Sequence, residues 1–119
     1  MILRLGTVDK WREARLDAGA QGAVVFKSSP TCSLSHHIEE RFRKWYAARV
    51  PDAVPPAYDV NVLAARDLSN HIAATLAVPH ESPQVIWLDA EGEVIAHASH
   101  GAITTEWLDT GLGRLGAEV

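Results

Sequence analysis

The sequence predicts an α/β fold in which a mixed four-stranded β-sheet carries helices on both faces. Segments with strand character and segments with helical periodicity alternate in the order α-β-α-β-α-β-β-α. A helix joins the first two strands, so they should lie parallel with a right-handed crossover. Only a short turn separates the last two strands, which predicts an antiparallel hairpin. We expect a single domain over residues 1–119, since this length suffices to bury one core.

The N-terminal part of the chain predicts one helix and one strand. Residues 1–6 have no assignment beyond a possible short edge strand. Thr7 is a suitable N-cap, and apolar residues recur on one side of the helix that follows, up to about residue 18. The run at 23–27 follows Gly22 and is short, apolar and β-branched, as buried strands are.

The central part predicts a long helix, a strand and a further helix. Apolar residues at helical spacing predict a helix from Cys32 to about Arg49. Its opposite face carries charged residues that we expect to be solvated, namely Glu39, Glu40, Arg43 and Lys44. Alternating apolar and polar residues predict a half-buried strand over 58–62. Asp67 begins the next helix, whose apolar residues recur at steps of four until Pro79 stops it.

The C-terminal part predicts the hairpin and a last helix. Residues 84–88 and 93–98 are the two strands, and the turn between them contains Gly92. Thr104 or Thr105 caps the final helix, whose apolar side consists of Leu108, Leu112 and Leu115.

Composition and charge exclude several classes of function. A net charge of −4 and a pI near 5.8 argue against nucleic-acid binding, which needs a basic surface. No apolar run approaches the roughly 20 residues of a membrane span, and the N-terminus lacks the apolar stretch of a secretory signal. With one cysteine, no internal disulfide can form, which fits a reducing compartment. We therefore expect a cytoplasmic protein with no nucleic-acid or membrane partner.

The one cysteine stands where a strand gives way to a helix. Cys32 follows the strand 23–27 and a short loop, so it lies in the first turn of the long helix. The positive end of the helix dipole and its free N–H groups favour an anion there, and the thiolate is the reactive form of cysteine. Ser35 lies three residues on, hence on the same helix face, where its hydroxyl can donate a hydrogen bond to the thiolate. The alternative is an inert buried cysteine beside a surface serine.

Six histidines raise the question of a metal site. His36 and His37 are adjacent, so they point in different directions on a helix. Cys32 and His36 stand at i and i+4 and could share a zinc ion, but no second pair of ligands is apparent. We expect no metal.

Three segments carry a resemblance to a known family. They are Phe26-Lys27 with Thr31-Cys32-Ser33-Leu34-Ser35, then Asp67-Leu68-Ser69-Asn70 with Ile72-Ala73, and His80-Glu81-Ser82-Pro83-Gln84-Val85. A strand, a cysteine at a helix start and a proline just before a hairpin look like the thioredoxin fold. The segments are similar to those of the monothiol bacilliredoxin family, over about residues 7 to 110. The family usually has proline after the cysteine, whereas this chain has Ser33, which bears on the rigidity of the turn.

The resemblance implies a thiol–disulfide oxidoreductase that removes bacillithiol, a small thiol, from protein mixed disulfides. Cys32 would be the catalytic nucleophile, and Ser35 stands where dithiol relatives carry a resolving cysteine. Because a hydroxyl cannot resolve a mixed disulfide, a second bacillithiol or a partner reductase must release Cys32. Bacillithiol is then a co-substrate, S-bacillithiolated proteins are the partners, and no cofactor takes part.

Five further residues are candidate substrate-binding residues: Lys27, Thr31, Ser33, Ser82 and Pro83. Lys27 ends a strand near the cysteine, where it could stabilise the thiolate, hold a substrate carboxylate or simply be solvated. Thr31 is a loop residue whose backbone could contact a ligand. The resemblance implies that Pro83 is cis and faces the cysteine, and that the Ser82 backbone pairs with substrate like an added strand. By its position alone, Pro83 could equally be a plain strand starter.

Two other functions stay open. The protein could be a non-catalytic redox sensor or binding module of thioredoxin fold whose Cys32 is S-thiolated under oxidative stress. An iron–sulfur carrier like the monothiol glutaredoxins is the weaker option, because the Cys-Gly-Phe-Ser of those proteins is missing.

Overall fold

A computed structural model of the chain describes residues 2–18, 21–49 and 53–117. The strands are β1 (Ile2–Arg4), β2 (Ala23–Ser28), β3 (Ala57–Asn61), β4 (Gln84–Leu88) and β5 (Val94–Ser99). The helices are α1 (Val8–Ala18), α2 (Ser33–Ala47), α3 (Arg66–Leu76) and α4 (Thr105–Ala117), and the short 3-10 helix η3 (His100–Ala102) precedes α4. Every predicted helix and strand is present, and η3 is an addition.

The strands form one mixed sheet in the order β1-β3-β2-β4-β5. β2 pairs parallel with β3 and antiparallel with β4, and β4 and β5 form the antiparallel hairpin. The parallel first pair and the hairpin are therefore confirmed. The sheet has five strands rather than four, because Ile2–Arg4 pairs parallel with β3 and covers an edge that would otherwise leave backbone groups unpaired.

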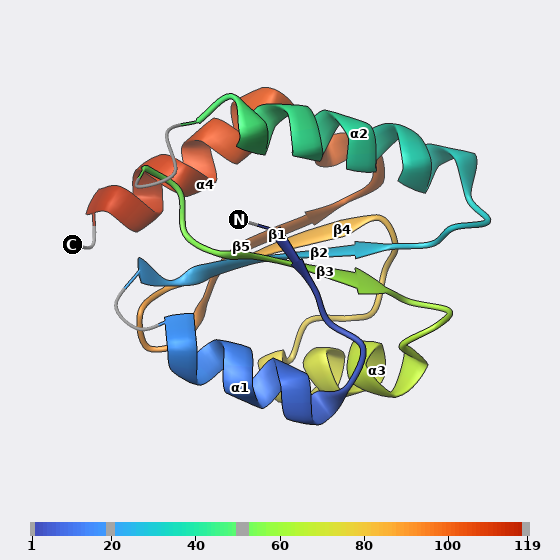
Figure 1. Ribbon diagram of the computed structural model, residues 1–119. Helices are drawn as coiled ribbons and strands as arrows, with labels where there is room; N and C mark the ends of the chain where they lie inside the picture. The colour runs from blue at the N-terminus through green and yellow to red at the C-terminus, as the bar shows by residue number, and fades with distance from the viewer. Residues whose placement is uncertain (1, 19–20, 50–52, 118–119) are drawn as a thin grey trace.

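Helices cover both faces of the sheet, as predicted. In Figure 1, α2 and α4 lie above the sheet, and α1 and α3 lie below it. Successive strand residues point to opposite faces, so Val25 packs below the sheet and Phe26 packs above it. Hydroxyl caps begin two of the helices: Thr7 Oγ1 accepts the Lys10 N–H, and Thr104 Oγ1 accepts the Trp107 N–H. Of the two candidate caps for the last helix, Thr104 is therefore the one used.

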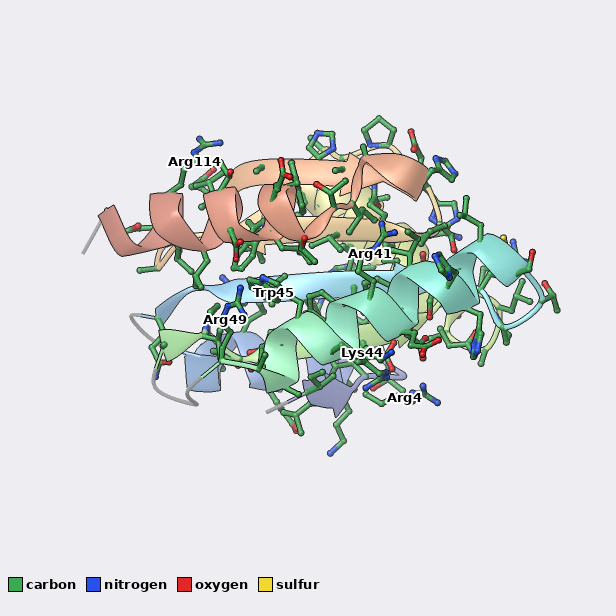
Figure 2. The ribbon with its side chains drawn as sticks, turned by 90° about the horizontal axis from the view of Figure 1, so that it is seen from above. Arg4, Arg41, Lys44, Trp45, Arg49 and Arg114 are labelled. Atoms are coloured by element: carbon green, nitrogen blue, oxygen red, sulfur yellow. The ribbon has the colours of Figure 1, made fainter. Side chains whose placement is uncertain are left out.

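Polar contacts at the surface tie the two upper helices together. The indole N–H of Trp45 on α2 donates to Asp109 on α4 over 2.9 Å. Arg49 pairs with the same carboxylate and lies over the Trp45 ring, 4.7 Å from its centroid (Figure 2). The hydrogen bond from Trp45, and after it the hydrogen bond from Arg49, lower the pKa of Asp109. The two helices therefore cover the aromatic residues above the sheet, and the Trp45 ring stays buried between them.

The contact between α4 and the sheet depends on one glycine. Gly111 is buried, and a Cβ at this position would lie 2.3 Å from Nε1 and 2.6 Å from Cδ1 of Trp87. Trp87 is fully buried on β4, so its ring has no free volume to move into. Only glycine allows the helix this close to the indole.

We expect Gly111→Ala to lower the free energy of unfolding by about 1–2 kcal/mol net, because overpacking against Trp87 outweighs the gain in helix propensity. Gly113→Ala is the matched control, because an added Cβ there meets nothing within 4 Å. It should raise the free energy of unfolding by about 0.5–1 kcal/mol. Urea denaturation of the three proteins measures both changes, and a stabilised Gly111→Ala variant would contradict this packing.

Candidate functional site

The cysteine lies at the end of the central strand of the sheet. β2 ends at Ser28, residues 29–32 form a loop that we call the cysteine loop, and Cys32 is the N-cap residue of α2. The Cys32 backbone is extended, with φ −105° and ψ 120°, and its carbonyl accepts the His36 N–H over 3.1 Å. Cys32 is half-buried, and its side chain makes no capping hydrogen bond. Cys32 therefore lies one residue before the first turn of α2, whereas we expected it within that turn.

Ser35 joins the cysteine loop to the segment that precedes β4. Its hydroxyl is fully buried, accepts the Ser29 N–H over 3.1 Å and shares a hydrogen bond with the Ser82 hydroxyl over 3.3 Å. Ser29 and Thr31 share a further hydroxyl contact of 3.2 Å within the loop. Ser35 is therefore not the surface serine of the alternative interpretation, and it brings Ser82 next to the first turn of α2.

Hydrogen bonds hold the segment 79–83, which we call the proline loop, against neighbouring residues. The side chain of Gln84 donates to the Pro79 carbonyl, and the Pro83 carbonyl accepts the His100 N–H. Glu81 accepts a hydrogen bond from Ser99, and Nδ1 of His100 lies 3.5 Å from the same carboxylate.

The Ser82–Pro83 peptide bond is cis, as the family resemblance implies. Ser82 is half-buried and Pro83 is buried, whereas Thr31 and Ser33 are exposed around the cysteine. The fold therefore brings four of the five candidate substrate-binding residues to one end of the sheet, together with Cys32 and Ser35.

Lys27 does not join them at the surface. Its side chain is fully buried, and its amine donates to the Ser69 carbonyl on α3 over 3.1 Å and lies 3.3 Å from Nδ1 of His80. Both partners lie below the sheet, on the face away from α2. A contact with a substrate carboxylate would need an exposed amine, and a solvated lysine is equally inconsistent with this burial.

The burial of Lys27 changes the titration of two groups. Burial lowers the pKa of Lys27 from its ordinary value of 10.5 to about 8. Partial burial and the nearby charge of Lys27 both lower the pKa of His80. His80 is then neutral near pH 7, and its Nδ1 can accept hydrogen bonds from the Lys27 amine and the Ser69 hydroxyl, which lies at 3.2 Å. Lys27, Ser69 and His80 thus form a polar cluster that joins β2 and α3 to the proline loop, with Lys27 and Ser69 buried and His80 exposed.

Sequence reasoning did not predict this cluster, although each of its residues stood in one of the three quoted segments. A polar residue inside an otherwise apolar strand, as at Lys27, and a serine on the apolar side of a helix, as at Ser69, were the available signals. Their meeting depends on contacts across 42 and 53 positions of the chain, which no local spacing reveals.

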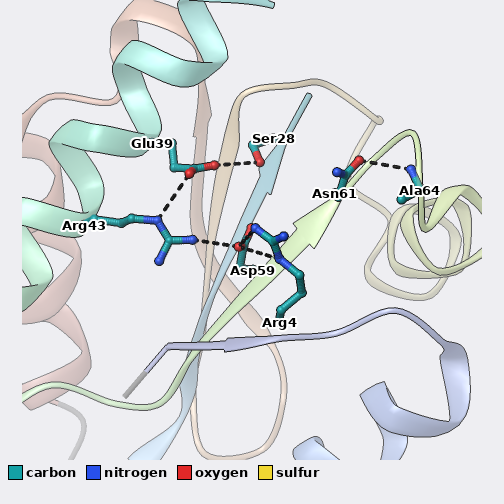
Figure 3. Close-up of polar contacts among 7 residues, drawn as sticks. All are labelled: Arg4, Ser28, Glu39, Arg43, Asp59, Asn61 and Ala64. Carbon is teal, nitrogen blue, oxygen red and sulfur yellow. Dashed lines mark hydrogen bonds and ion pairs between the residues drawn. The ribbon is translucent and has the colours of Figure 1, made fainter. Parts of the chain in front are cut away.

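A second polar cluster lies above the sheet, where β1, β3 and β2 end. Oδ2 of Asp59 accepts hydrogen bonds from Arg4 over 2.9 Å and from Arg43 over 2.8 Å, and Arg43 also donates to Glu39 (Figure 3). Glu39 in turn accepts the Ser28 hydroxyl over 3.1 Å. Asp59 is 2% exposed, and its Oδ1 has no hydrogen-bond partner within the described part of the chain. Glu39 and Arg43 are therefore half-buried network members rather than residues of a solvated face.

A groove on the α2–α4 side is not a candidate site for the chemistry. It has a volume of about 530 Å³, and its cations already have partners. Lys44 pairs with Glu40, Arg49 pairs with Asp109, and Arg41 donates to the Ile103 carbonyl. Figure 2 labels these three cations on α2 and just beyond it. None of its lining residues belongs to the cysteine loop.

The described residues contain neither a group of metal ligands nor a membrane-spanning helix. No three histidine, cysteine, aspartate or glutamate side chains among these residues gather closely enough to hold a metal ion. None of the helices described is both long and apolar enough to cross a membrane.

Comparison with solved structures shows the class of protein. A candidate oxidoreductase with a thioredoxin fold superposes with a TM-score of 0.80 at 29% identity, and the match covers 92% of each chain. The reduced thioredoxin pre-protein of Schistosoma mansoni gives a TM-score of 0.74 at 11% identity, covering 96% of this chain and 97% of that one. Thioredoxin of Fasciola hepatica gives 0.73 at 18% identity, covering 96% and 98%. The chain has the thioredoxin fold, with its one cysteine at the start of α2.

A comparison with models of protein families shows the family to which the chain belongs. A model of the family described as Monothiol bacilliredoxin BrxC matches residues 3–108, and the chain belongs to this family. Its family and its fold make it a thiol redox protein, an oxidoreductase of the thioredoxin class.

We expect the stability of the protein to depend on the buried amine of Lys27. Between about pH 8 and pH 10 the unfolded chain binds more protons at this residue than the folded protein does, so stability should rise with pH in this window. Lys27→Met removes the cost of burying the charge, which is at most about 3 kcal/mol near pH 7. The variant should therefore gain over the parent at neutral pH, and the difference should shrink as the pH rises.

Urea denaturation of parent and variant at about pH 7, 8.5 and 10 measures this difference, and groups whose pKa does not depend on Lys27 cancel in the comparison. The pKa of His80 does depend on Lys27, so the comparison between pH 8.5 and pH 10, above the ordinary range of histidine, carries the test. A difference in unfolding free energy that stays constant across the series would contradict the lowered pKa of Lys27.

Proposed function

We propose that this protein removes bacillithiol from protein mixed disulfides, with Cys32 as the nucleophile. The observation that carries the proposal is the placement of the one thiol of the chain. Cys32 occupies the N-cap position of α2, and Ser35, in the first turn, is hydrogen-bonded to Ser82 of the proline loop. Membership of the monothiol bacilliredoxin family supports the choice of bacillithiol as the small thiol.

The reaction is an exchange of disulfide bonds in two steps. The Cys32 thiolate attacks the bacillithiol sulfur of the modified protein, a new S–S bond forms, and the client sulfur leaves as a thiolate that takes up a proton. The thiolate of a second bacillithiol then attacks the bacillithiol sulfur carried by Cys32. This step forms the symmetrical bacillithiol disulfide and returns the Cys32 thiolate, so free bacillithiol is the reductant. A partner reductase could perform the second step by the same exchange.

Ser35 cannot perform this second step, because an alcohol does not exchange with a disulfide. The role proposed for it is to hold the cysteine loop and the proline loop together through Ser29 and Ser82. The backbone of Ser82, ahead of Pro83, would pair with an extended client segment as an added strand. Thr31 and Ser33 are exposed next to Cys32 and would contact the same client. A cytoplasmic location, where thiols are kept reduced, accords with this chemistry.

Cys32→Ser should abolish the release of bacillithiol from a client protein while leaving the fold intact. The reason is that the variant contains no thiol. Release is measured by intact mass of an S-bacillithiolated client over several turnovers, and circular dichroism is the control for folding. Retained release would rule out Cys32 as the nucleophile. A parent protein that accepts one bacillithiol and never turns over would instead be a redox sensor.

Ser35→Cys should convert the chemistry from one thiol to two. Residue 35 lies in the first turn of α2, three positions after the N-cap Cys32, so we expect a thiol there to attack the mixed disulfide on Cys32 from within the chain. Intramolecular attack has a large effective concentration over an external thiol. After one equivalent of a bacillithiol mixed disulfide, the variant should contain an internal disulfide and no adduct, by intact mass and free-thiol count.

The matched control is His37→Cys, which places a thiol on the same helix but on a different face. This variant should keep the adduct on Cys32 for as long as the parent does. If Ser35→Cys keeps it equally long, position 35 does not face the sulfur.

A further inference from the structure

A small cavity lies beside the cysteine loop and has no role in the exchange chemistry described above. Its volume is about 230 Å³, the share of roughly eight water molecules in the liquid. It can hold a fragment of a small molecule but not a peptide segment. Its walls come from the cysteine loop, from α2 and from two strand ends, and include Ser29, Pro30, His36, Glu39, Arg4 and Asn61.

The position of the cavity is one where ligands bind in related architectures. β1, β3 and β2 run parallel, so their C-terminal ends meet at the same edge of the sheet. In open α/β sheets, ligands bind in the crevice outside these ends. His36 begins the next helical turn after Cys32, to whose carbonyl its N–H donates, and one turn advances only about 5 Å. Cys32 does not itself line the cavity, so a molecule joined to its sulfur would have to span about one helical turn to reach this space.

The walls offer charges of both signs. The side chain of Arg4 is 65% exposed, and Asp59 holds it through Nε and Nη2, which leaves Nη1 without a bonded partner among the described residues. His36, which also lines the cavity, is exposed. Glu39 is fixed by Ser28 and Arg43, so its carboxylate is held in place.

The remaining polar groups favour a ligand with N–H or O–H groups. The Asn61 side-chain oxygen accepts two backbone N–H groups, which leaves the amide nitrogen free to donate. Ser28 and Ser29 also line the cavity and contribute hydroxyl groups to its wall. The cavity thus suits a ligand with both a carboxylate and amino or hydroxyl groups.

We propose that this cavity binds the polar, carboxylate-bearing end of the small thiol while its sulfur is exchanged at Cys32. The inference rests on the proposed function and adds the subsite that selects the thiol. Arg4 and His36 receive the carboxylate, and Glu39 and Asn61 face the amino or hydroxyl groups. Selection then acts on the small thiol rather than on the client protein.

The test compares two mixed disulfides of one client protein, made with bacillithiol and with 2-mercaptoethanol, which has neither carboxylate nor amine. Single-turnover formation of the Cys32 adduct is followed by intact mass with the parent, Arg4→Gln, His36→Gln and the distant control Arg12→Gln. Arg4→Gln should slow the reaction with the bacillithiol adduct about tenfold, the typical effect of losing a charge-assisted hydrogen bond. The reaction with the mercaptoethanol adduct should change by less than about twofold, and it also reports whether each variant is folded.

Each outcome bears on the inference separately from the proposed function. His36→Gln should reproduce the selective loss more weakly, and Arg12→Gln should match the parent with both adducts. Equal losses on both adducts would assign the cavity to the client or to the fold, and no loss in either cavity variant would leave it without a ligand role. Both results overturn the inference while the exchange function stands. A parent that does not react with the bacillithiol adduct but reacts with the mercaptoethanol adduct overturns the proposed function itself.

Discussion

The pairing of β2 determines where everything functional in this protein lies. β2 is parallel to β3 on one side and antiparallel to β4 on the other. The end of β2, the end of β3 and the beginning of β4 therefore meet at the same edge of the sheet. The cysteine loop follows the first, Asn61 ends the second, and the proline loop precedes the third. A sheet with any other pairing of its central strand would separate these segments by the length of a strand.

Hydrogen bonds from two buried side chains then fix what the pairing brings together. The hydroxyl of Ser35 bridges the two loops through Ser29 and Ser82, and Lys27 connects β2 to α3 and to His80. Buried polar groups such as Ser35 and Lys27 are costly to leave unpaired, so the loops have few alternative positions. Such rigidity suits a thiol exchange, because the attacking sulfur must meet a disulfide in line without first ordering its surroundings.

Local patterns predicted nearly all of the fold, whereas the polar clusters lay beyond their reach. Helical spacing and short β-branched runs located each helix and the four longer strands, and the edge strand β1 escaped assignment because three residues carry no periodicity. The direction of Lys27 could have been inferred, since it shares a strand face with Val25 rather than with Phe26. What it meets there could not, because Ser69 and His80 are distant in sequence. Likewise, we expected Arg43 to be solvated, but it pairs with Asp59. Only the packed fold brings these two side chains together.

The amine of Lys27 should be unusually reactive, because its pKa is low, and yet it is inaccessible to reagents, because it is fully buried. A lysine with a pKa of about 8 has a far larger neutral, nucleophilic fraction at neutral pH than an ordinary surface lysine does. Acylating reagents should nevertheless reach the surface Lys10 and Lys44 first, because no part of Lys27 is exposed. Acylation of Lys27 can proceed only in conformations in which the end of β2 has opened away from α3. The rate at which Lys27 is acylated therefore measures how often β2 and α3 separate locally. The half-buried Cys32 thiol cannot measure this opening, because reagents reach it without any such separation.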